Sequence, residues 1–317
     1  MERTTIFRKL TSGLLLAGSA LFFNPANAQH VVDASIEGRW DITVDMGGNP
    51  RPSWLEVTHS GNNTLVGQFC SVSGSARPIS KVNFTGGKLS FSIPPQWESG
   101  NQDFSVEGTM ADGKFTGTLT TPSGSKHNWT GVRAPSLKRT AAPVWGTPIK
   151  LISGNDTKGW HATGNNQWVV ENGVLRSPKS GANLITDQKF NDFKLHVEFR
   201  VPKESNSGVY LRGRYEVQVA DSKGKEALKD EMGAIYGFLV PSEQMAKDPG
   251  EWQTMDITLI GRMVSLVING KPAITNQAIP GITGGALDSN EGEPGPIFLQ
   301  GDHGPVEYRN LVITPAK

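Results

Sequence analysis

The chain has 317 residues, and its 31 Lys and Arg side chains balance 30 Asp and Glu side chains to a formal net charge of +1. The two signs are interspersed, so neither a basic stripe for nucleic acid nor a basic amphipathic helix for a membrane surface is expected. Cys70 is the single cysteine, which excludes an intrachain disulfide and a thiolate metal cluster.

Residues 1–28 predict a secretory signal peptide. Basic residues at positions 3, 8 and 9 precede the apolar run 14–23, and the small-residue triplet 26–28 follows it. This is the order of an export signal with its cleavage site, and the run is shorter than the ~20 apolar residues of a membrane span. We expect cleavage after Ala28, a periplasmic or secreted mature protein, and no membrane association after cleavage.

Residues 29–134 predict a small antiparallel β-barrel or meander domain. Alternating runs lie at 39–44, 54–57, 65–69, 79–84, 88–93, 104–108 and 114–119. Gly-Asn, Gly-Gly and Asp-Gly pairs between runs supply hairpin turns, because these residues tolerate a positive φ. Successive hairpins favour an up-and-down barrel filled by its own side chains, with Trp40 and Trp54 in the core, over a barrel that holds a ligand.

Prolines at positions 135, 143 and 148 predict a linker over residues 135–148. Residues 149–317 then predict a second all-β domain, a β-sandwich. In the run 193–201, apolar residues alternate with Lys194, His196, Glu198 and Arg200. Because side chains alternate across a strand, one face of this strand belongs to the core and the other is polar.

The same alternation recurs in the runs 207–212, 215–219 and 306–309, whose polar positions carry Arg with Glu or Gln and hardly any Lys or Thr. Arg pairs with carboxylates in a fixed geometry, so we expect one prearranged polar face. Many directional donors and acceptors suit a sugar, whereas a row of solvated cross-strand ion pairs is the alternative. The residues assigned to this face are Glu198, Arg200, Arg212, Glu216, Gln218, Glu307 and Arg309.

Gln300, Asp302 and His303 follow the apolar run 297–299. With Glu216 or Glu307 nearby, the Asp-His pair would complete a three-ligand site for a divalent metal. Spacing alone does not support such a site, so we assign no metal and no cofactor.

Many motifs of the second domain stand in the order found in one known family. They are Asp156–Trp160, Trp168–Leu175, Asp192–Phe193, Glu198–Arg200, Asn206–Gly213, Tyr215–Gln218, Asp221, Gly233–Gly237, Gly250–Trp252, Asn269–Gly270, Gly295–Gln300, Asp302–Gly304 and Glu307–Asn310. From Pro148 onward the chain resembles the 3-keto-disaccharide hydrolase family. The resemblance implies a concanavalin-like jelly-roll β-sandwich and an exported enzyme that acts on glycosides oxidised at carbon 3.

Cleavage of such a sugar by elimination needs a base near C2, a group that stabilises the enolate oxygen and an acid for the leaving oxygen. Candidate bases are Glu198 and Glu216, and candidate acids are Asp302 and His303. Arg200, Arg212 and Arg309 are candidates for stabilising the enolate. Further expected substrate contacts are Gln218, Gln300, Glu307, and the aromatic residues Tyr210, Tyr236 and Trp252.

Two other functions remain open. The string Glu216-x-Gln218-x-x-Asp221 is similar to the catalytic strand of jelly-roll β-glucanases, but Gln218 cannot replace a carboxylate, and retaining hydrolysis requires two carboxyls ~5 Å apart. A non-catalytic carbohydrate-binding module would need the polar face without a base. In each case the expected partner is an oligosaccharide or glycoside and not nucleic acid, and the sequence predicts no oligomeric state.

Overall fold

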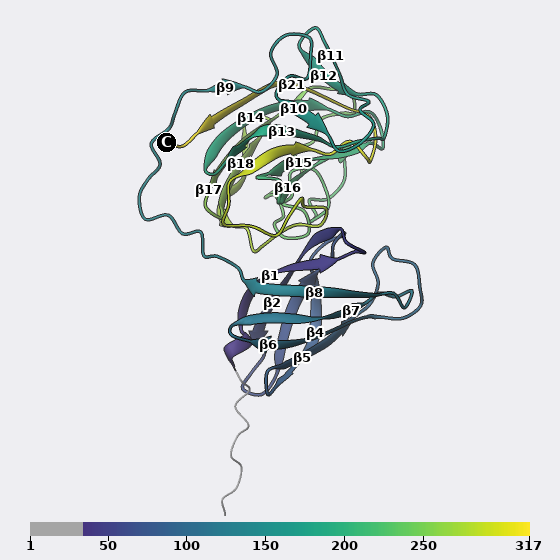
Figure 1. Cartoon of the computed structure of the whole chain (residues 1–317). Coiled ribbons are helices and arrows are strands. Elements are labelled where there is room, and N and C mark those ends of the chain that lie inside the picture. Colours follow the sequence, from purple (N-terminus) through teal and green to yellow (C-terminus); the bar gives the residue numbers. More distant parts are fainter. Residues whose placement is uncertain (1–33) are drawn as a thin grey trace, which may run out of the picture. The chain divides into compact units, whose positions relative to one another are not determined.

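The computed structural model describes residues 34–317, which lie within one compact unit, Val32–Lys317. The predicted signal peptide lies outside the described residues. Apart from one 3₁₀ turn, η1 (Ala34–Ile36), the regular structure of this part of the chain consists of β-strands (Figure 1). The all-β prediction is therefore confirmed. Within residues 34–317, no helix has the length and apolar character to cross a membrane.

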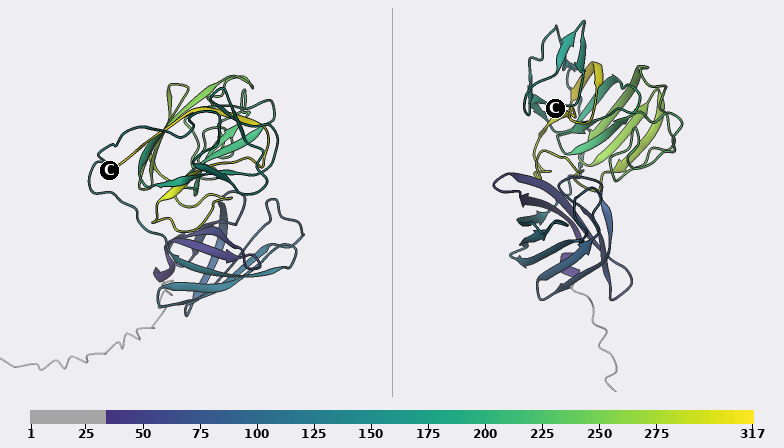
Figure 2. Two further views of the ribbon diagram at one scale, coloured as in Figure 1. Left: turned by 45° about the horizontal axis from the view of Figure 1, so that its top comes forward. Right: turned by 90° about the vertical axis from the view of Figure 1, so that its right-hand side faces the viewer.

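The first strands form a closed antiparallel barrel in which each strand pairs with the next and β1 pairs with β8. The curved strands are drawn in purple to teal in Figure 2. This order is the predicted up-and-down barrel. The strands are β1 (Gly38–Asp45), β2 (Pro50–His59), β3 (Leu65–Cys70), β4 (Arg77–Thr85), β5 (Lys88–Ile93), β6 (Phe104–Ala111), β7 (Lys114–Thr120) and β8 (Lys126–Arg133).

Alternate side chains of these strands fill the barrel. The rings of Trp40 and Phe115 meet edge to face with centroids 4.6 Å apart, and Trp129 packs against the same phenylalanine. Strand β8 was not predicted from the sequence, because Trp129 and Gly131 are its only buried residues. A single tryptophan and a glycine on the inner face give no period-two apolar pattern.

The second half of the chain forms two antiparallel sheets, the predicted jelly-roll type of sandwich. One sheet has the order β10-β13-β20-β15-β16, and the other has the order β11-β12-β21-β14-β17-β18-β19, with β9 paired to β21. The strands are β9 (Ile149–Lys150), β10 (Trp160–Ala162), β11 (Val169–Glu171), β12 (Val174–Ser177), β13 (Leu184–Phe190), β14 (Phe193–Arg200), β15 (Asn206–Leu211), β16 (Tyr215–Ala220), β17 (Gln253–Ile260), β18 (Met263–Ile268), β19 (Lys271–Ala278), β20 (Gly295–Leu299) and β21 (Val306–Pro315).

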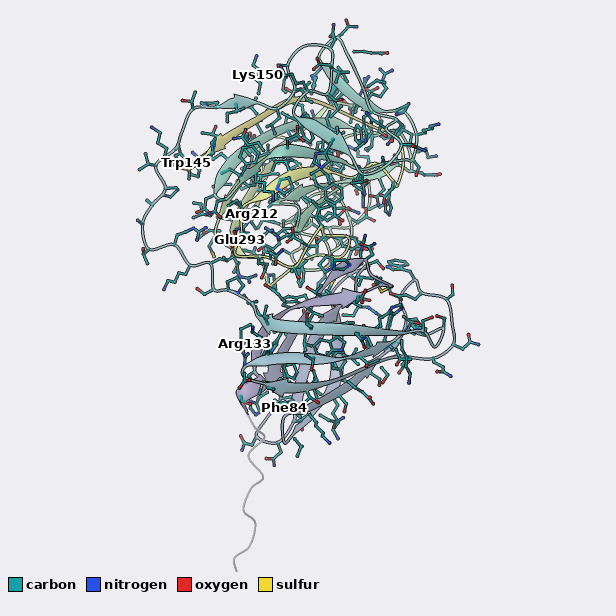
Figure 3. All side chains as sticks on the ribbon, in the orientation of Figure 1. Phe84, Arg133, Trp145, Lys150, Arg212 and Glu293 are labelled. Atoms are coloured by element: carbon teal, nitrogen blue, oxygen red, sulfur yellow. The ribbon has the colours of Figure 1, made fainter. Side chains whose placement is uncertain are left out.

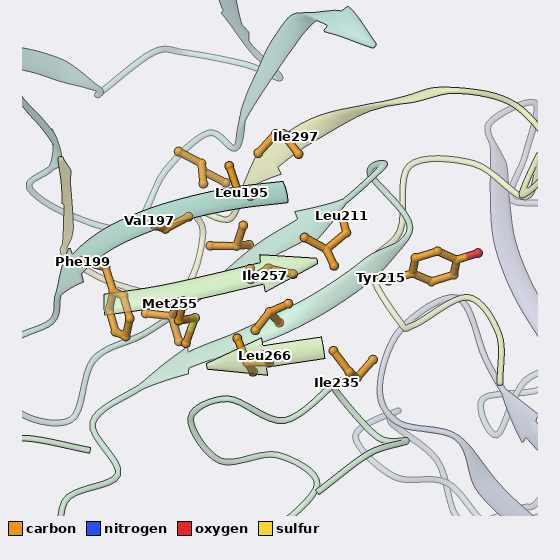
Figure 4. Packing of buried hydrophobic residues seen from close by; sticks show 14 of the residues in the cluster. Leu195, Val197, Phe199, Leu211, Tyr215, Ile235, Met255, Ile257, Leu266 and Ile297 are labelled. Atoms are coloured by element: carbon orange, nitrogen blue, oxygen red, sulfur yellow. The ribbon is translucent and has the colours of Figure 1, made fainter. Parts of the chain in front are cut away.

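The core of the sandwich comes from the apolar positions that the alternation predicts. Leu195, Val197 and Phe199 of β14 lie in one buried cluster with Met255 and Ile257 of β17 (Figure 4). Fully burying such a side chain contributes roughly 1.5–3 kcal/mol. The polar partners on β14 are consequently left on the opposite side of their sheet.

Two barrel strands contribute to this second core and to a buried charge cluster beside it. Trp54 of β2, which was expected in the barrel core, is instead buried in the sandwich core, where its ring meets Phe238 edge to face at 5.1 Å. That part of the prediction is wrong, because alternation along β2 does not show which of two cores its buried side chains enter. On β1, Trp40 faces the barrel interior, whereas Asp41 points outward and lies beside Glu291 and Arg262. Burial, followed by the charge of Glu291 and a hydrogen bond to it, raises the pKa of Asp41 to about 9.

The raised pKa of Asp41 predicts that the protein loses stability as the pH rises from about 4 to about 9. The folded chain keeps a proton on Asp41 that the unfolded chain releases above pH 3.8. The contribution of this proton to the free energy of unfolding is therefore fully present below pH 3.8 and is lost as the pH rises through about 9. The slope from one such proton is at most about 1.4 kcal/mol per pH unit. Asp41→Asn imitates the protonated acid, and its Tm should fall less than that of the unsubstituted protein from about pH 6 to about pH 9.

Asp112→Asn is the matched control, because Asp112 is exposed in the β6–β7 turn and Asn also tolerates its positive φ. Its Tm should follow that of the unsubstituted protein at every pH. An equal fall in Tm from about pH 6 to about pH 9 in the Asp41→Asn and unsubstituted proteins would show that Asp41 holds no such proton.

Candidate functional site

The polar residues expected on one face fall on two different sheets, so the single-face expectation is wrong. Glu198 and Arg200 lie on β14, and Glu307 and Arg309 lie on its neighbour β21 in one sheet. Glu216 and Gln218 lie on β16, in the other sheet. Alternation fixes which side of a strand is polar, but it does not show which strands share a sheet.

The group on β14 and β21 is an ion-pair network, the alternative considered for such a face. Glu198 accepts hydrogen bonds at 2.6 Å from both Arg309 Nε and Asn310 Nδ2. Burial raises the pKa of Glu198, but these two hydrogen bonds and the charge of Arg309 outweigh it and hold the pKa below its usual value. Glu198 is therefore a paired anion.

Glu307 and Trp252 complete this network. The guanidinium of Arg200 bonds to Glu307, and Arg176 Nε lies 2.7 Å from the same carboxylate. The guanidinium groups of Arg309 and Arg200 lie over the Trp252 ring, 4.0 Å and 4.8 Å from its centroid. A hollow of about 390 Å³ lies alongside, but the charged groups that line it are already paired with one another.

Arg212 lies outside both groups. Strand β15 ends at Leu211, and Arg212 follows with a φ of 53°. Its side chain is buried in the sandwich part of the chain (Figure 3) and donates to the Gly261 carbonyl at 2.8 Å. The turn thus directs Arg212 away from the strand face that the alternation assigned to it.

The other group surrounds a pocket of about 400 Å³ formed around β15 and β16, within the size range of small-molecule sites. Six of the residues expected from the sequence line it: Tyr210, Glu216, Gln218, Tyr236, Gln300 and His303. Other lining residues were not assigned to the site from the sequence: Ser73, Gly74, Trp97, Asn206, Gly284 and Gly285. Of these, Asn206 had a sequence signal, since it begins one of the motifs of the family resemblance.

Glu216 is buried in this pocket opposite Tyr210, its cross-strand neighbour. The Tyr210 hydroxyl lies 2.9 Å from Glu216 Oε2 and also 2.9 Å from the Gly284 carbonyl. A Cβ atom on Gly208 would lie 2.3 Å from Glu216 Oε1, so only glycine at this position leaves room for the carboxyl.

The hydrogen bonds around Tyr210 can form with either protonation state of Glu216. A tyrosine hydroxyl has one hydrogen, and the Gly284 carbonyl can only accept. When Glu216 is protonated it donates to Tyr210, and Tyr210 donates to Gly284. When Glu216 is ionised, the tyrosine must give its hydrogen to one of two acceptors.

Burial has the largest effect on the pKa of Glu216. Burial raises the pKa of Glu216 to about 8, against opposing effects of the Tyr210 hydrogen bond and the His303 charge. Asp302 adds to the increase. A carboxyl with a pKa in this range can exchange a proton near neutral pH, which is the property of a general acid or base.

Asp302 and His303 form a second titrating pair at the pocket. His303 Nδ1 lies 2.6 Å from Asp302 Oδ1, and this hydrogen bond raises the pKa of His303. Burial raises the pKa of Asp302, but the hydrogen bond and charge of His303 outweigh burial and lower it. Among the described residues that line the pocket, His303 is the only one that can carry a positive charge near neutral pH.

Three amide oxygens line the same pocket and have no hydrogen-bond donor among the described residues. They are Asn206 Oδ1, Gln218 Oε1 and Gln300 Oε1. Gln218 Nε2 donates to the Asp230 carbonyl at 2.9 Å, which fixes the amide with its oxygen free. Each unpaired buried acceptor costs about 1–3 kcal/mol, so the pocket suits a ligand with several hydroxyl donors.

Within residues 34–317, no cluster of three or more His, Cys, Asp or Glu side chains has the arrangement of a metal site. Asp302 and His303 bond to each other. Glu307, which the sequence offered as a third ligand, is paired with Arg200 in the other sheet.

Residues 147–314 match the family model described as the 3-keto-alpha-glucoside-1,2-lyase-like domain. The chain belongs to this family. The resemblance noted from the sequence is thus confirmed, and the matched residues include both β-sheets of the sandwich but not the barrel strands.

A curated relative of the family is the 3-keto-disaccharide hydrolase of Bacteroides thetaiotaomicron, which is 29% identical to this chain over 94 residues. The match covers 26% of this chain and 32% of the relative, so the chain spans about a third of the length of that protein.

Two solved structures with similar folds cover about half of the chain. A protein from Parabacteroides distasonis ATCC 8503, described as a candidate glycosyl hydrolase, is 28% identical, with a TM-score of 0.46 over 57% of this chain and 96% of its own. Carbohydrate-binding module CBM66 from Bacillus subtilis is 13% identical, with a TM-score of 0.35 over 48% and 93% of the two chains.

The hydrogen bond between Tyr210 and Glu216 predicts a measurable shift in a titration. Tyr210→Phe removes a donor that favours the ionised carboxyl, so the pKa of Glu216 should rise above about 8. Carbon-13 NMR of the glutamate carboxyls, with Glu216→Gln used to assign the resonance, measures it. The Glu198 resonance is the internal control and should titrate below its usual pKa in both proteins. A lower Glu216 pKa in Tyr210→Phe would contradict the assignment.

Proposed function

We propose that this protein is a carbohydrate-active enzyme that cleaves the glycosidic bond of 3-keto-glycosides, with Glu216 as the base. One observation carries the proposal: a buried carboxyl with a pKa of about 8 lies in a pocket lined with unpaired hydrogen-bond acceptors. Membership of the 3-keto-alpha-glucoside-1,2-lyase-like family supports the substrate class. The signal peptide that the sequence predicts over residues 1–28 supports export.

The reaction proceeds by elimination followed by hydration. A ketone at C3 makes the proton on C2 acidic, and a base removes this proton to give an enolate. The enolate re-forms the ketone, makes a C1=C2 double bond and expels the C1 oxygen, which leaves as an alcohol after it gains a proton. Water then adds across the double bond, with its oxygen at C1 and a proton at C2, so that the net change is hydrolysis.

Glu216 has the properties that the first step requires. A base works best when its pKa is near the working pH, and burial brings the pKa of Glu216 to about 8. Tyr210 can donate to the ionised form, which orients the carboxylate. After proton transfer, the protonated acid donates to Tyr210, and Tyr210 donates to Gly284.

His303 supplies the positive charge for this scheme. The candidate arginines 200 and 309 belong to the ion-pair network of the other sheet, and Arg212 bonds to Gly261. The Asp302 carboxylate raises the pKa of His303 and holds its Nδ1. His303 is therefore the group that we assign to stabilise the enolate oxygen or protonate the leaving oxygen.

The remaining polar groups hold the sugar. The free oxygens of Asn206, Gln218 and Gln300 accept hydrogen bonds from ring hydroxyls. Half-buried Tyr236 adds an aromatic edge to the same pocket. Directional acceptors and an aromatic edge together are the surface that a sugar needs.

The other two candidate functions fit the pocket less well. Glu216 is the only carboxylate among its lining residues, whereas a retaining glycosidase uses two carboxyls ~5 Å apart. Asp221, from the β-glucanase-like string, accepts a backbone hydrogen bond from Glu204 instead. A pure binding module would have no use for a buried carboxyl, which is costly to desolvate.

Replacing the two candidate bases separates them. Glu216→Gln should lower kcat on a 3-keto-disaccharide by about 10²–10⁴-fold, the range of general-base catalysis. Glu198→Gln, the matched control in the ion-pair network, should leave kcat essentially unchanged. Steady-state kinetics with p-nitrophenyl 3-keto-glucoside and with p-nitrophenyl glucoside should show release only from the oxidised sugar. Full turnover by Glu216→Gln, or equal release from both sugars, would reject the elimination scheme.

A further inference from the structure

The barrel supplies part of the pocket wall. Ser73 and Gly74, between β3 and β4, line the pocket together with Trp97, between β5 and β6. These residues lie outside the part of the chain that matches the family model. The pocket is thus completed by a segment that the family domain does not contain.

Trp97 is unusual among the aromatic residues of the chain. Its exposed fraction is 65%, and the other large hydrophobic residues that are exposed in residues 34–317 are valine and leucine. A tryptophan costs free energy when left in water. At the edge of a pocket with a buried polar floor, it offers a flat apolar face to a ligand.

The loop that carries Trp97 is held in place by its neighbours. The backbone N–H groups of Gln96 and Trp97 both donate to the Glu98 carboxylate, at 2.9 and 3.1 Å. The Gln96 side chain bonds to Ser75, whose N–H donates to Gln96 Oε1 at 3.0 Å. These contacts join the two barrel loops and hold the backbone that carries the indole.

The β3–β4 loop in turn contacts the family domain backbone to backbone. A Cβ atom on Gly284 would lie 2.1 Å from the Gly74 carbonyl oxygen, so a larger residue could not be accommodated without moving one of the loops. The Gly285 N–H donates to the Val72 carbonyl at 3.3 Å. Gly284 also accepts from Tyr210, and this contact therefore connects the barrel directly to the Glu216 site.

The burial of Glu216 indicates which end of a substrate lies deep in the pocket and which end lies near its exposed edge. Glu216 is 4% exposed, so the oxidised ring must enter deeply for C2 to approach its carboxyl. The group bonded to C1 is then left toward the exposed residues, where Trp97 and His303 lie. Sugar rings and aromatic rings both present a face that can stack on an indole.

We propose that Trp97 is the binding surface for the leaving group, so that the enzyme prefers 3-keto-glycosides whose C1 substituent is a ring over those with a short alkyl group. This inference rests on the proposed function. Trp97 is thus a specificity-determining residue that the barrel contributes.

The test assays the full-length protein with two substrates. One is a 3-keto-disaccharide, which has a ring as its C1 substituent, and the other is methyl 3-keto-glucoside, which has only a methyl group there. Trp97→Ala should lower kcat/KM for the disaccharide by about two- to tenfold, the range that one aromatic contact of this kind contributes. It should leave kcat/KM for the methyl glycoside unchanged. Trp97→Phe keeps a stacking face and should restore most of the loss.

Trp145→Ala is the matched control, because Trp145 lies in the segment between barrel and sandwich with Lys194 against its ring (Figure 3). Trp145→Ala should change kcat/KM for neither substrate. Equal losses on both substrates, or no loss on the disaccharide, would overturn the inference.

A binding measurement separates this inference from the catalytic assignment. In a Glu216→Gln background, calorimetry should show that Trp97→Ala raises the Kd of the 3-keto-disaccharide by about two- to tenfold and leaves the Kd of the methyl glycoside unchanged. If Glu216→Gln turned over at the full rate, the proposed base would be wrong, but the ratio of the two substrates would still decide the role of Trp97.

Discussion

The site depends on the hydrogen bonds that join Glu216, Tyr210 and the Gly284 carbonyl. Tyr210 has one hydrogen for two acceptors, so it donates either to the ionised carboxyl of Glu216 or to the Gly284 carbonyl. Burial penalises the ionised carboxylate and raises its pKa to about 8. After Glu216 takes a proton from a substrate, the carboxyl can donate to Tyr210, and Tyr210 can donate to the Gly284 carbonyl.

These hydrogen bonds end at the backbone segment that touches the barrel. Gly284 lies against Gly74 with no space for a side chain between them, and the barrel residue Trp54 is buried in the sandwich core. Asp41 adds a buried carboxyl beside Glu291 and Arg262. The barrel is for these reasons part of the structure that positions Tyr210, and its loops complete the pocket around Glu216.

The sequence predicted most elements and many site residues, because both depend on local patterns. Alternation located strand β14 and the two strands that carry Tyr210 and Glu216, since each strand has one apolar side. It did not reveal that Glu198 and Glu216 belong to different sheets, because pairing between distant strands leaves no periodic trace. Strand β8 was missed because one tryptophan and one glycine fill its inner face. Trp97 could not be assigned to the pocket, since its role comes from contacts between two loops and a distant glycine.

Isotope exchange tests the central claim, that Glu216 removes the proton from C2, most directly. A 3-keto-disaccharide is incubated with the protein in heavy water, and the released 3-keto-glucose is analysed by mass spectrometry against a sample without protein. The account predicts one deuterium at C2 in the released sugar beyond the background of the protein-free sample, and none with Glu216→Gln. Release of a sugar that keeps its original hydrogen at C2 would contradict it.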